Sequence, residues 1–388
     1  MNKQQTFRSI SSTLSISIST LRKPREKFSS PSHIMGLFDF LKSKSRMKPY
    51  DLIRSLAQDL RSAQAASPES FTFLSVPDSD YNELENYLAA ACAGVTANVH
   101  IKKHPKADDI ERCLVAAVQE LLLVHIAAKI SDLSPETRRI LSAIWGYLLK
   151  LEHPKSFQRP MVEFLVSHLG SVDRLLESYG KSQRGADVTI GIMIRDASRF
   201  SKIVEHILKD DLVYMLFPVM ASGNFDVSSD AFQTMREVLT NHKDVSAPWL
   251  SKNFDKFFSR YMGPLQSPTE DSYVIVRQSL SVLSGILLDR QFMDTMLQFV
   301  NREDFLKSIL VLMSNESKAV KYEAFHVFKI FAANPQKPPK VAKILSLNYN
   351  RILRLLDQIE NDRLDDNEFR QDKKAVVGKL EMLSKTVK

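Results

Sequence analysis

Three stretches of this chain repeat one pattern: SSDAFQTMREVLTNH at 228–242, VRQSLSVLSGILLDR at 276–290 and VKYEAFHVFKIFAAN at 320–334. Aligning them on Phe232, Leu280 and Phe325 gives intervals of 48 and 45 residues. A fourth copy, ADVTIGIMIRDASRF, places Ile190 another 42 residues upstream. Self-similarity at about 40–47 residues is typical of HEAT and armadillo repeats, whose units are pairs or triplets of helices.

Such a helical unit cannot bury its apolar face alone, and stacking neighbouring units creates one continuous core. We therefore predict an all-α protein: a right-handed armadillo/HEAT-like helical-repeat solenoid, a curved rod with a concave binding face. The alternative is a large irregular helical bundle, which the same helices would also permit.

Helical periodicity extends from residue 49 onward, and no convincing alternating strand interrupts it. Between 107 and 131, one apolar face is predicted to run through Ile110, Cys113, Leu114, Ala117, Val118, Leu121 and Leu122. Ser134-Pro135-Glu136 has the cap residue and first-turn proline that open a helix. Further helices are predicted near 171–180, 186–196, 198–208, 210–221, 227–242, 250–262, 269–289, 291–301, 303–314, 317–333, 348–361 and 366–386.

The composition agrees with a large helical core. Of 388 residues, 44% are hydrophobic and 25% charged, and only 11 are glycine, which argues against turn-rich β sandwiches and barrels. Two cysteines, Cys92 and Cys113, cannot form a disulfide framework or a Cys-rich zinc site, so a reducing, cytoplasmic location is expected. The most apolar run, 114–130, is interrupted by polar residues, which argues against a membrane span.

The net charge of +8 is concentrated in residues 1–34, which hold six basic residues and one acidic residue. The other 354 residues hold 47 basic and 44 acidic residues, too even a balance to predict nucleic-acid binding. The serine-rich segment 1–34 is interpreted as a disordered leader or a transit-type presequence, or else translation starts at Met35. We predict one armadillo-like scaffold domain over 35–388.

Catalytic and metal-binding patterns are weak. Gly180-Lys181-Ser182 has the tail of a P-loop, but Leu175 replaces its leading glycine. The acidic run 361–368 lacks the oxygen spacing and central glycine of an EF-hand calcium loop. The nine histidines form no metal-binding pair, and no activated nucleophile is recognisable. We expect no enzyme activity, no metal and no cofactor.

Five ordered blocks carry a resemblance to a known family: FDVSSDAFQTMREVLTNHK (225–243), FDKFFSRY (254–261), SYVIVRQSLSVLSGILLDR (272–290), KYEAFHVFKIFAANPQKP (321–338) and NDRLDDNEFRQDK (361–373). Their order and spacing resemble the calcium-binding protein 39 family, also called mouse protein 25-like. The likeness is specific over 211–375 and weaker over 107–210. GLFDFLKSKSRMKPYDLIRSL (36–56) resembles the family's start, residues 67–106 match poorly, and 1–34 lie outside the pattern.

The resemblance implies a non-catalytic, armadillo-like scaffold for intracellular signalling in polarity, cell division or growth. Members of the family bind and stabilise the active conformation of sterile-twenty-type serine/threonine kinases or related pseudokinases. They use a concave face against the kinase and a pocket that accepts a C-terminal hydrophobic tail of Trp-Glu-Phe type. Nucleic acid and membrane insertion are not implied.

On the concave face, Phe225, Tyr273 and Arg277 match the family's contact residues, whereas Ser281 stands where the family has a lysine. Tyr273, Arg277 and Ser281 recur at i, i+4 and i+8, which aligns them along one helix face. From the residues alone, Tyr273 could instead be a boundary residue, Arg277 a solvated one and Phe225 a packing residue.

At the tail pocket, Lys307 fits the family's basic position and Leu310 replaces a methionine. Leu347 stands where the family has a lysine. The losses at Ser281 and Leu347 weaken the attraction for an acidic tail residue by only about 0.2–1 kcal/mol per exposed pair. They leave open a helical-repeat adaptor that binds another peptide without activating a kinase.

Overall fold

The computed structural model describes residues 47–63, 78–96, 105–182, 185–267, 272–361 and 366–386. The leader 1–34 and the alternative start at Met35 lie outside these residues. The described chain forms helices and no β-strand. It divides at His242 into two compact units, called here the N-terminal unit (described from 47 to 242) and the C-terminal unit (described from 243 to 386).

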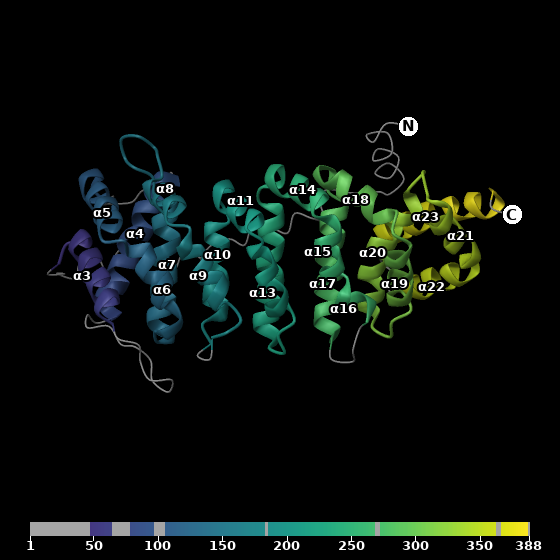
Figure 1. Ribbon diagram of the computed structural model, residues 1–388, viewed down its shortest axis with the longest axis horizontal. Helices are drawn as coiled ribbons and strands as arrows, with labels where there is room; N and C mark the ends of the chain where they lie inside the picture. The colour runs from purple at the N-terminus through teal and green to yellow at the C-terminus, as the bar shows by residue number, and fades with distance from the viewer. Residues whose placement is uncertain are drawn as a thin grey trace. The chain divides into compact units, whose positions relative to one another are not determined.

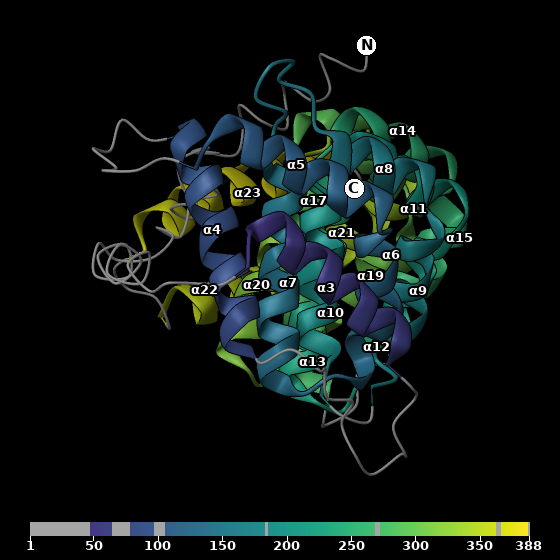
Figure 2. The ribbon, with the colours of Figure 1, turned by 90° about the vertical axis from the view of Figure 1, so that its left-hand side faces the viewer.

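The N-terminal unit contains α3 (Pro49–Ser62), α4 (Asp78–Thr96), α5 (Ala107–Gln119), α6 (Leu122–Lys129), η1 (Ile130–Asp132), α7 (Pro135–Lys150), α8 (Pro160–Ser167), α9 (Gly170–Ser178), α10 (Asp187–Ala197), α11 (Ser201–Lys209), η2 (Leu212–Met215), α12 (Leu216–Met220) and α13 (Phe225–Thr240). Helices α4, α7, α10 and α13 pack successively, each against the next. Figures 1 and 2 show α7, α10 and α13 as neighbours in both views.

The C-terminal unit contains α14 (Lys243–Lys252), α15 (Phe254–Tyr261), α16 (Gly263–Gln266), α17 (Tyr273–Leu287), η4 (Arg290–Phe292), α18 (Met293–Val300), α19 (Glu303–Leu312), α20 (Lys318–Ala333), α21 (Pro339–Leu347), α22 (Tyr349–Asn361) and α23 (Asn367–Thr386). Helices α17, α20 and α23 pack in succession, so this unit repeats the arrangement. The predicted all-α helical-repeat solenoid is confirmed, and the single scaffold domain over 35–388 stays a prediction.

The repeat alignment identifies true core positions. Ile190, Phe232, Leu280 and Phe325 lie in α10, α13, α17 and α20, and all four side chains are fully buried. Burying a side chain of this size contributes about 1.5–3 kcal/mol. The recurring apolar residue therefore supplies one core contact per repeat, and in α13, α17 and α20 it stands at the same place in the helix.

Side-chain caps fix where these long helices begin. The Ser134 hydroxyl accepts a hydrogen bond from the Thr137 backbone N–H, with Pro135 in the first turn, as the sequence predicts. Asn224 caps α13 by accepting from two backbone N–H groups, and Ser317 caps α20. Each cap satisfies donors that the helix itself leaves free, which contributes about 1 kcal/mol.

The prediction of one continuous apolar face from Ile110 to Leu122 is wrong, because the helix breaks between α5 and α6. Leu121 adopts a left-handed conformation (φ = 52°), and its side chain is exposed. The two segments meet at a bend of 58°. The bend lets α6 pack against α3 and α9, which buries Leu122 on a new face.

The predicted helix 250–262 is likewise two helices, α14 and α15, separated at Asn253. Residues 254–261, one of the five blocks, place Phe257 and Phe258 in an aromatic core. The ring of Phe258 lies 5.5 Å from that of Phe299, which lies 4.9 Å from that of Phe305 in α19. This cluster anchors α19 to the centre of the C-terminal unit.

By length and composition, no single described helix qualifies as a membrane span; the bent pair Ala107–Gln119 with Leu122–Asp132 qualifies when its two parts are taken together.

Candidate functional site

Helix α17 presents an exposed stripe beside a buried one. Tyr273 is 44% exposed, Arg277 is exposed and Ser281 is half-buried, along the face that the sequence predicts. Val276 and Leu280 are buried on the side that packs against α20. Arg277 forms no ion pair with any residue that the structure describes, so its guanidinium is available to a partner.

The helix itself is held firmly in the core. The hydroxyl of Tyr261 in α15 donates a hydrogen bond of 2.9 Å to the backbone carbonyl of Ser279, and both groups are buried. A buried hydrogen bond of this kind contributes about 1 kcal/mol and fixes rotation about the helix axis. Tyr273 and Arg277 are thus carried on a rigid element.

Phe225 belongs to the N-terminal unit, where it is the first residue of α13. Its side chain is 63% exposed, directly after the capping residue Asn224. The alternative interpretation of Phe225 as a packing residue is therefore not supported by its burial. A large aromatic side chain in water is a common anchor for a protein partner.

A cavity of about 250 Å³ opens between α19, α21 and α22 of the C-terminal unit. The pocket is lined by Lys307, Leu310, Val311, Ile344, Asn348, Arg351, Ile352 and Leu355. Lys307 and Leu310, two residues assigned from the sequence to a tail pocket, both lie in this lining. Leu347, the third, is 75% exposed and is not a lining residue, although Asn348 next to it is.

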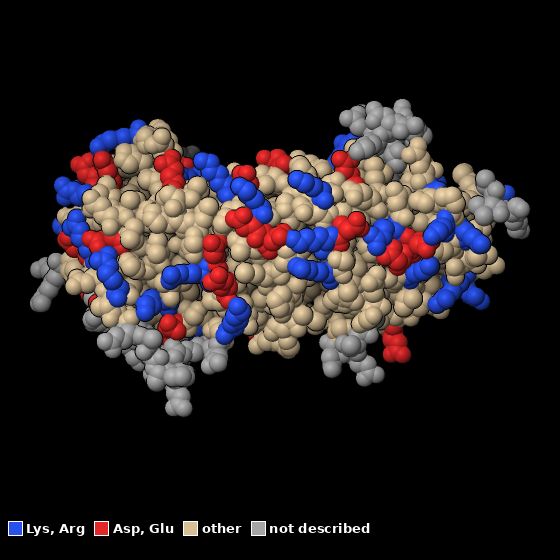
Figure 3. All heavy atoms as spheres, in the orientation of Figure 1, with Lys and Arg blue, Asp and Glu red and all other residues tan. Residues whose placement is uncertain are grey.

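The charges around the pocket are unevenly compensated. Lys307 Nζ lies 3.6 Å from a carboxylate oxygen of Glu303, and Lys340 Nζ lies at the same distance from that oxygen. Arg351 donates to the hydroxyl of Ser314 at 3.3 Å. Lys and Arg side chains are prominent over α21 and α22 in Figure 3, beside a smaller acidic group.

Sequence reasoning missed six of the pocket residues: Val311, Ile344, Asn348, Arg351, Ile352 and Leu355. Within α22, residues 351, 352 and 355 follow helical spacing, whereas Ile344 lies in α21 and Asn348 lies at the junction of the two helices. Val311 is 60% exposed and extends the apolar surface at the mouth.

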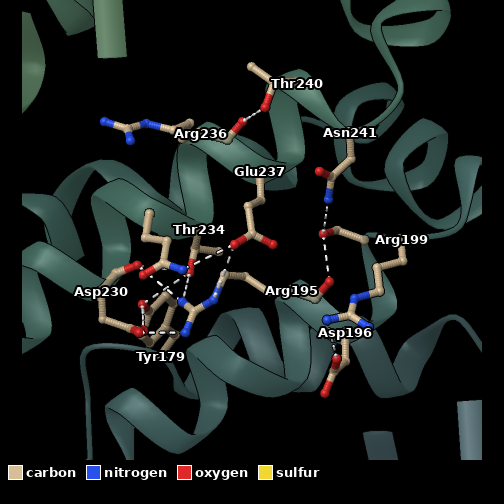
Figure 4. A network of polar contacts seen from close by, with 12 residues as sticks. Tyr179, Arg195, Asp196, Arg199, Asp230, Thr234, Arg236, Glu237, Thr240 and Asn241 are labelled. Atoms are coloured by element: carbon tan, nitrogen blue, oxygen red, sulfur yellow. Dashed lines mark hydrogen bonds and ion pairs between the residues drawn. The ribbon is translucent and has the colours of Figure 1, made fainter. Parts of the chain in front are cut away.

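The N-terminal unit contains a buried polar network between α9, α10 and α13, drawn in Figure 4. The Tyr179 hydroxyl donates to Asp230 at 2.5 Å, and Arg195 forms an ion pair with the same carboxylate at 2.7 Å. Arg195 also donates to the Thr234 hydroxyl at 2.7 Å. Burial, together with Asp230, raises the pKa of Tyr179 far above its usual range, so the phenol stays protonated.

A second buried pair lies in the C-terminal unit, where Lys329 of α20 donates to Asp372 of α23 at 2.5 Å. Both side chains are almost fully buried. In each case an acidic and a basic residue join neighbouring helices inside the stack. These networks have partners of their own, and neither opens onto the pocket, so we assign them to structure.

Among the described residues, no group of three or more His, Cys, Asp or Glu side chains is placed to hold a metal ion. The acidic run 361–368, weighed from the sequence as a calcium loop, falls partly outside the described residues.

The fold and the two surface features define a class: an all-α helical-repeat protein with an apolar, cationic pocket and an exposed helix face. A profile of the Mo25-like family matches residues 38–384. The chain belongs to the Mo25-like family, which confirms the resemblance found in the sequence.

Similar proteins carry the same family names. A Mo25-like protein of Schizosaccharomyces pombe is 30% identical over 89% of this chain and 99% of its own length. The conidiophore development protein hymA of Emericella nidulans is 30% identical over 90% and 94%, and a human calcium-binding protein 39-like protein is 29% identical over 74% and 82%. Membership of this family supports a scaffold role in general.

Among solved structures, a designed armadillo repeat protein aligns over 66% of this chain and 99% of its own, with 11% identity and a TM-score of 0.40. A TM-score of 0.40 supports no conclusion about the function of this chain.

Proposed function

We propose that this chain is a non-catalytic, cytoplasmic scaffold that binds and allosterically activates a sterile-twenty-type protein kinase or pseudokinase. The observation that carries the proposal is the pocket in which Lys307 and Leu310 meet. Two residues assigned to a peptide-binding pocket by family resemblance fall together in one cavity of the fold. Nothing in the repeat geometry alone would require a cation there.

The mechanism is a population shift. A scaffold that binds the active conformer of a kinase more tightly than the inactive one raises the occupancy of the active conformer. Moving an equilibrium from 1:99 to 99:1 requires a preference of about 5.5 kcal/mol. The stripe Tyr273, Arg277 and Ser281 of the C-terminal unit is one proposed contact with the kinase, and Phe225 of the N-terminal unit is another. The pocket is the proposed site for the C-terminal tail of the kinase.

The tail pocket and the surface that contacts the kinase have different roles in this proposal. The tail pocket supplies affinity, and tethering through it raises the effective concentration of the kinase at the second surface. The second surface supplies the discrimination between conformers, because only contacts that differ between the two states shift the equilibrium.

The test is co-purification of the full chain with a sterile-twenty-type kinase, followed by measurement of kinase turnover with and without the scaffold. Arg277→Ala and Phe225→Ala are each expected to weaken kinase recovery about ten-fold, since exposed Arg and aromatic side chains commonly dominate interfaces. Unchanged recovery in both variants, or kinase turnover indifferent to the wild-type protein, contradicts the proposal.

Matched controls exist in the same units. Phe157→Ala removes another phenylalanine of the N-terminal unit, 75% exposed in the loop between α7 and α8. Lys252→Ala removes another exposed cation of the C-terminal unit, at the end of α14. Both variants are expected to retain kinase recovery, which separates a specific surface from general loss of charge or apolar area.

The second candidate function is a helical-repeat adaptor that binds a peptide without activating a kinase. It is favoured by Ser281 and Leu347, where the family's lysines are missing, and by the position of Leu347 outside the pocket lining. An adaptor of this kind would co-purify with its partner and leave kinase turnover unchanged.

A further inference from the structure

The loop between α7 and α8 in the N-terminal unit holds a phenylalanine out in water. Phe157 is 75% exposed, and its backbone adopts the left-handed conformation (φ = 55°), which is unfavourable for a bulky side chain. The backbone carbonyl of His153 accepts hydrogen bonds from the N–H groups of Ser156 and Phe157, and the N–H of His153 donates to the carbonyl of Gln158 at 2.7 Å. These hydrogen bonds close the loop, so the exposed position of the ring is built into its backbone. The loop stands out beside α8 in Figures 1 and 2.

A cavity of about 540 Å³, called here the α3–α5 cavity, lies beside this loop. It is lined by Tyr50, Arg54, Asp108, Glu111, Arg112, Val115 and Lys155. Its volume is within the range of about 300–1,000 Å³ that binding sites commonly have. Because Lys155 belongs to the loop, the cavity and the exposed Phe157 ring are neighbours on the same surface.

One wall of the α3–α5 cavity is suited to an aromatic ring. The guanidinium of Arg112 lies 5.5 Å from the centre of the Tyr50 ring, which holds it in place. Arg112 forms no ion pair with any residue that the structure describes, so the other face of its guanidinium can stack on a second ring. Val115, which is 47% exposed, adds apolar surface on the same helix.

The charges around the α3–α5 cavity compensate one another within the same unit. Lys155 pairs with Glu111 at 2.7 Å, and Arg54 pairs with an aspartate of its own helix at 3.3 Å. The two remaining charged residues of the lining, Asp108 and Arg112, have opposite signs. This surface therefore does not repel an identical surface, and it offers little attraction to a strongly charged polymer. The balance favours a second copy of this chain as the partner.

We propose that the chain forms a two-fold symmetric dimer in which Phe157 of each copy inserts into the α3–α5 cavity of the other copy. In a two-fold interface both subunits use the same surface, so a projection and a cavity placed side by side make two identical contacts at once. Each Phe157 ring packs on Val115 and stacks on the guanidinium of Arg112 in the other copy. The inference goes beyond the proposed function, which assigns kinase binding to other residues.

The experiment is sedimentation velocity on the full chain alone, from about 1 to about 100 μM, which covers micromolar dissociation constants. Phe157→Ala removes the ring. Phe157→Asn also removes the ring, and because asparagine tolerates the left-handed conformation, this variant keeps the loop as it is. Val115→Lys places a long charged side chain in the cavity at an exposed helix position. Circular dichroism checks that each variant is folded.

Wild type is expected to pass from monomer to dimer within this range of concentration. Each of the three variants is expected to raise the Kd of the dimer at least ten-fold, since an aromatic contact is lost twice per dimer. A mixture of Phe157→Ala and Val115→Lys is expected to associate more than either variant alone. In that mixture the first variant keeps an open cavity and the second keeps the ring, so one of the two contacts is restored.

Matched controls come from the same unit. Phe225→Ala removes a phenylalanine that is 63% exposed, and Val188→Lys changes a valine that is 38% exposed on α10. Both are expected to dimerise as wild type does. Phe157→Ala, which loses the dimer, is expected to retain kinase recovery, so the dimer and the proposed function are tested separately.

The inference is overturned if wild type stays monomeric up to about 100 μM, or if Phe157→Ala or Phe157→Asn dimerises like wild type. It is also overturned if the mixture associates no better than its components, or if a control variant loses the dimer. Growth beyond two chains contradicts it as well, because a closed two-fold contact cannot extend. In each of these cases kinase co-purification and turnover still decide the scaffold proposal.

Discussion

Gly191 of α10 leaves no room for any side chain, and Gly191→Ala should damage the buried network of Figure 4. A Cβ atom on Gly191 would lie 1.8 Å from the Asp230 carboxylate oxygen and 2.7 Å from the Tyr179 hydroxyl. Both distances are far inside van der Waals contact. Since Asp230 also pairs with Arg195, the carboxylate cannot move away without breaking an ion pair.

The expected cost follows from that pair. Separating a buried ion pair destabilises a protein by about 3–5 kcal/mol, because a charge is left without compensation. Replacing a glycine inside a helix by alanine stabilises the helix by about 1 kcal/mol. The net loss in the free energy of unfolding is therefore about 2–4 kcal/mol. With a urea m-value of about 3 kcal/mol/M, the unfolding midpoint should fall by about 1 M.

The assay is urea unfolding followed by far-UV circular dichroism, with Gly378→Ala as the matched control. Gly378 lies inside α23, and a Cβ atom there would meet nothing within 4 Å. The control should be as stable as wild type or slightly more stable.

A double variant tests the mechanism. Asp230→Ala removes the obstructing carboxylate, so adding Gly191→Ala to it should cost much less than in wild type. A coupling energy of at least 1 kcal/mol is expected, within the range that contacting residues show. The reasoning is refuted if Gly191→Ala leaves the midpoint unchanged, or if the two substitutions are simply additive.

Three further predictions concern buried titratable groups. Burial and nearby Lys379 lower the pKa of Lys337 to about 8. Between this value and the unfolded pKa of about 10.5, the unfolded chain binds more protons than the folded chain, so the stability should rise with pH. Lys337→Met should reduce the rise of the urea unfolding midpoint between about pH 7.5 and about pH 10. Lys329→Met should destabilise the chain by about 3–5 kcal/mol in the same assay by leaving the Asp372 carboxylate unpaired, whereas combining it with Asp372→Leu should recover most of that loss. Burial raises the pKa of Cys113 to about 12, so iodoacetamide at pH 8 should alkylate its thiol in unfolded protein and leave it unmodified in folded protein, as mass spectrometry would report.

Much of the fold was predictable because it is local and periodic. Within each unit the repeated apolar residue marks helices that pack in succession: Ile190 and Phe232 on α10 and α13, and Leu280 and Phe325 on α17 and α20. Caps such as Ser134 are equally readable, because they depend on neighbours two or three residues away.

The break at Leu121 was not predictable from the same rules. Its local sequence continues the apolar period, and the bend appears only because α6 packs against α3 and α9. Tertiary packing overrides local propensity at such a point.

The pocket was half predictable. Lys307 and Leu310 are one turn apart on α19, so periodicity keeps them on one side. Leu347 and Arg351 lie across the junction at Asn348, where α21 ends and α22 begins. Their orientation depends on the angle of that junction, which no helical period within the sequence encodes.

The pairing of Lys329 with Asp372 makes the stability of α20 depend on the presence of α23. A chain that terminates before α23 would leave the buried ammonium group of Lys329 without its carboxylate partner. The unpaired lysine would destabilise the C-terminal unit, and the partly unfolded product would be a substrate for proteases and chaperones. A frameshift before α23 would thus be expected to lower the amount of folded protein.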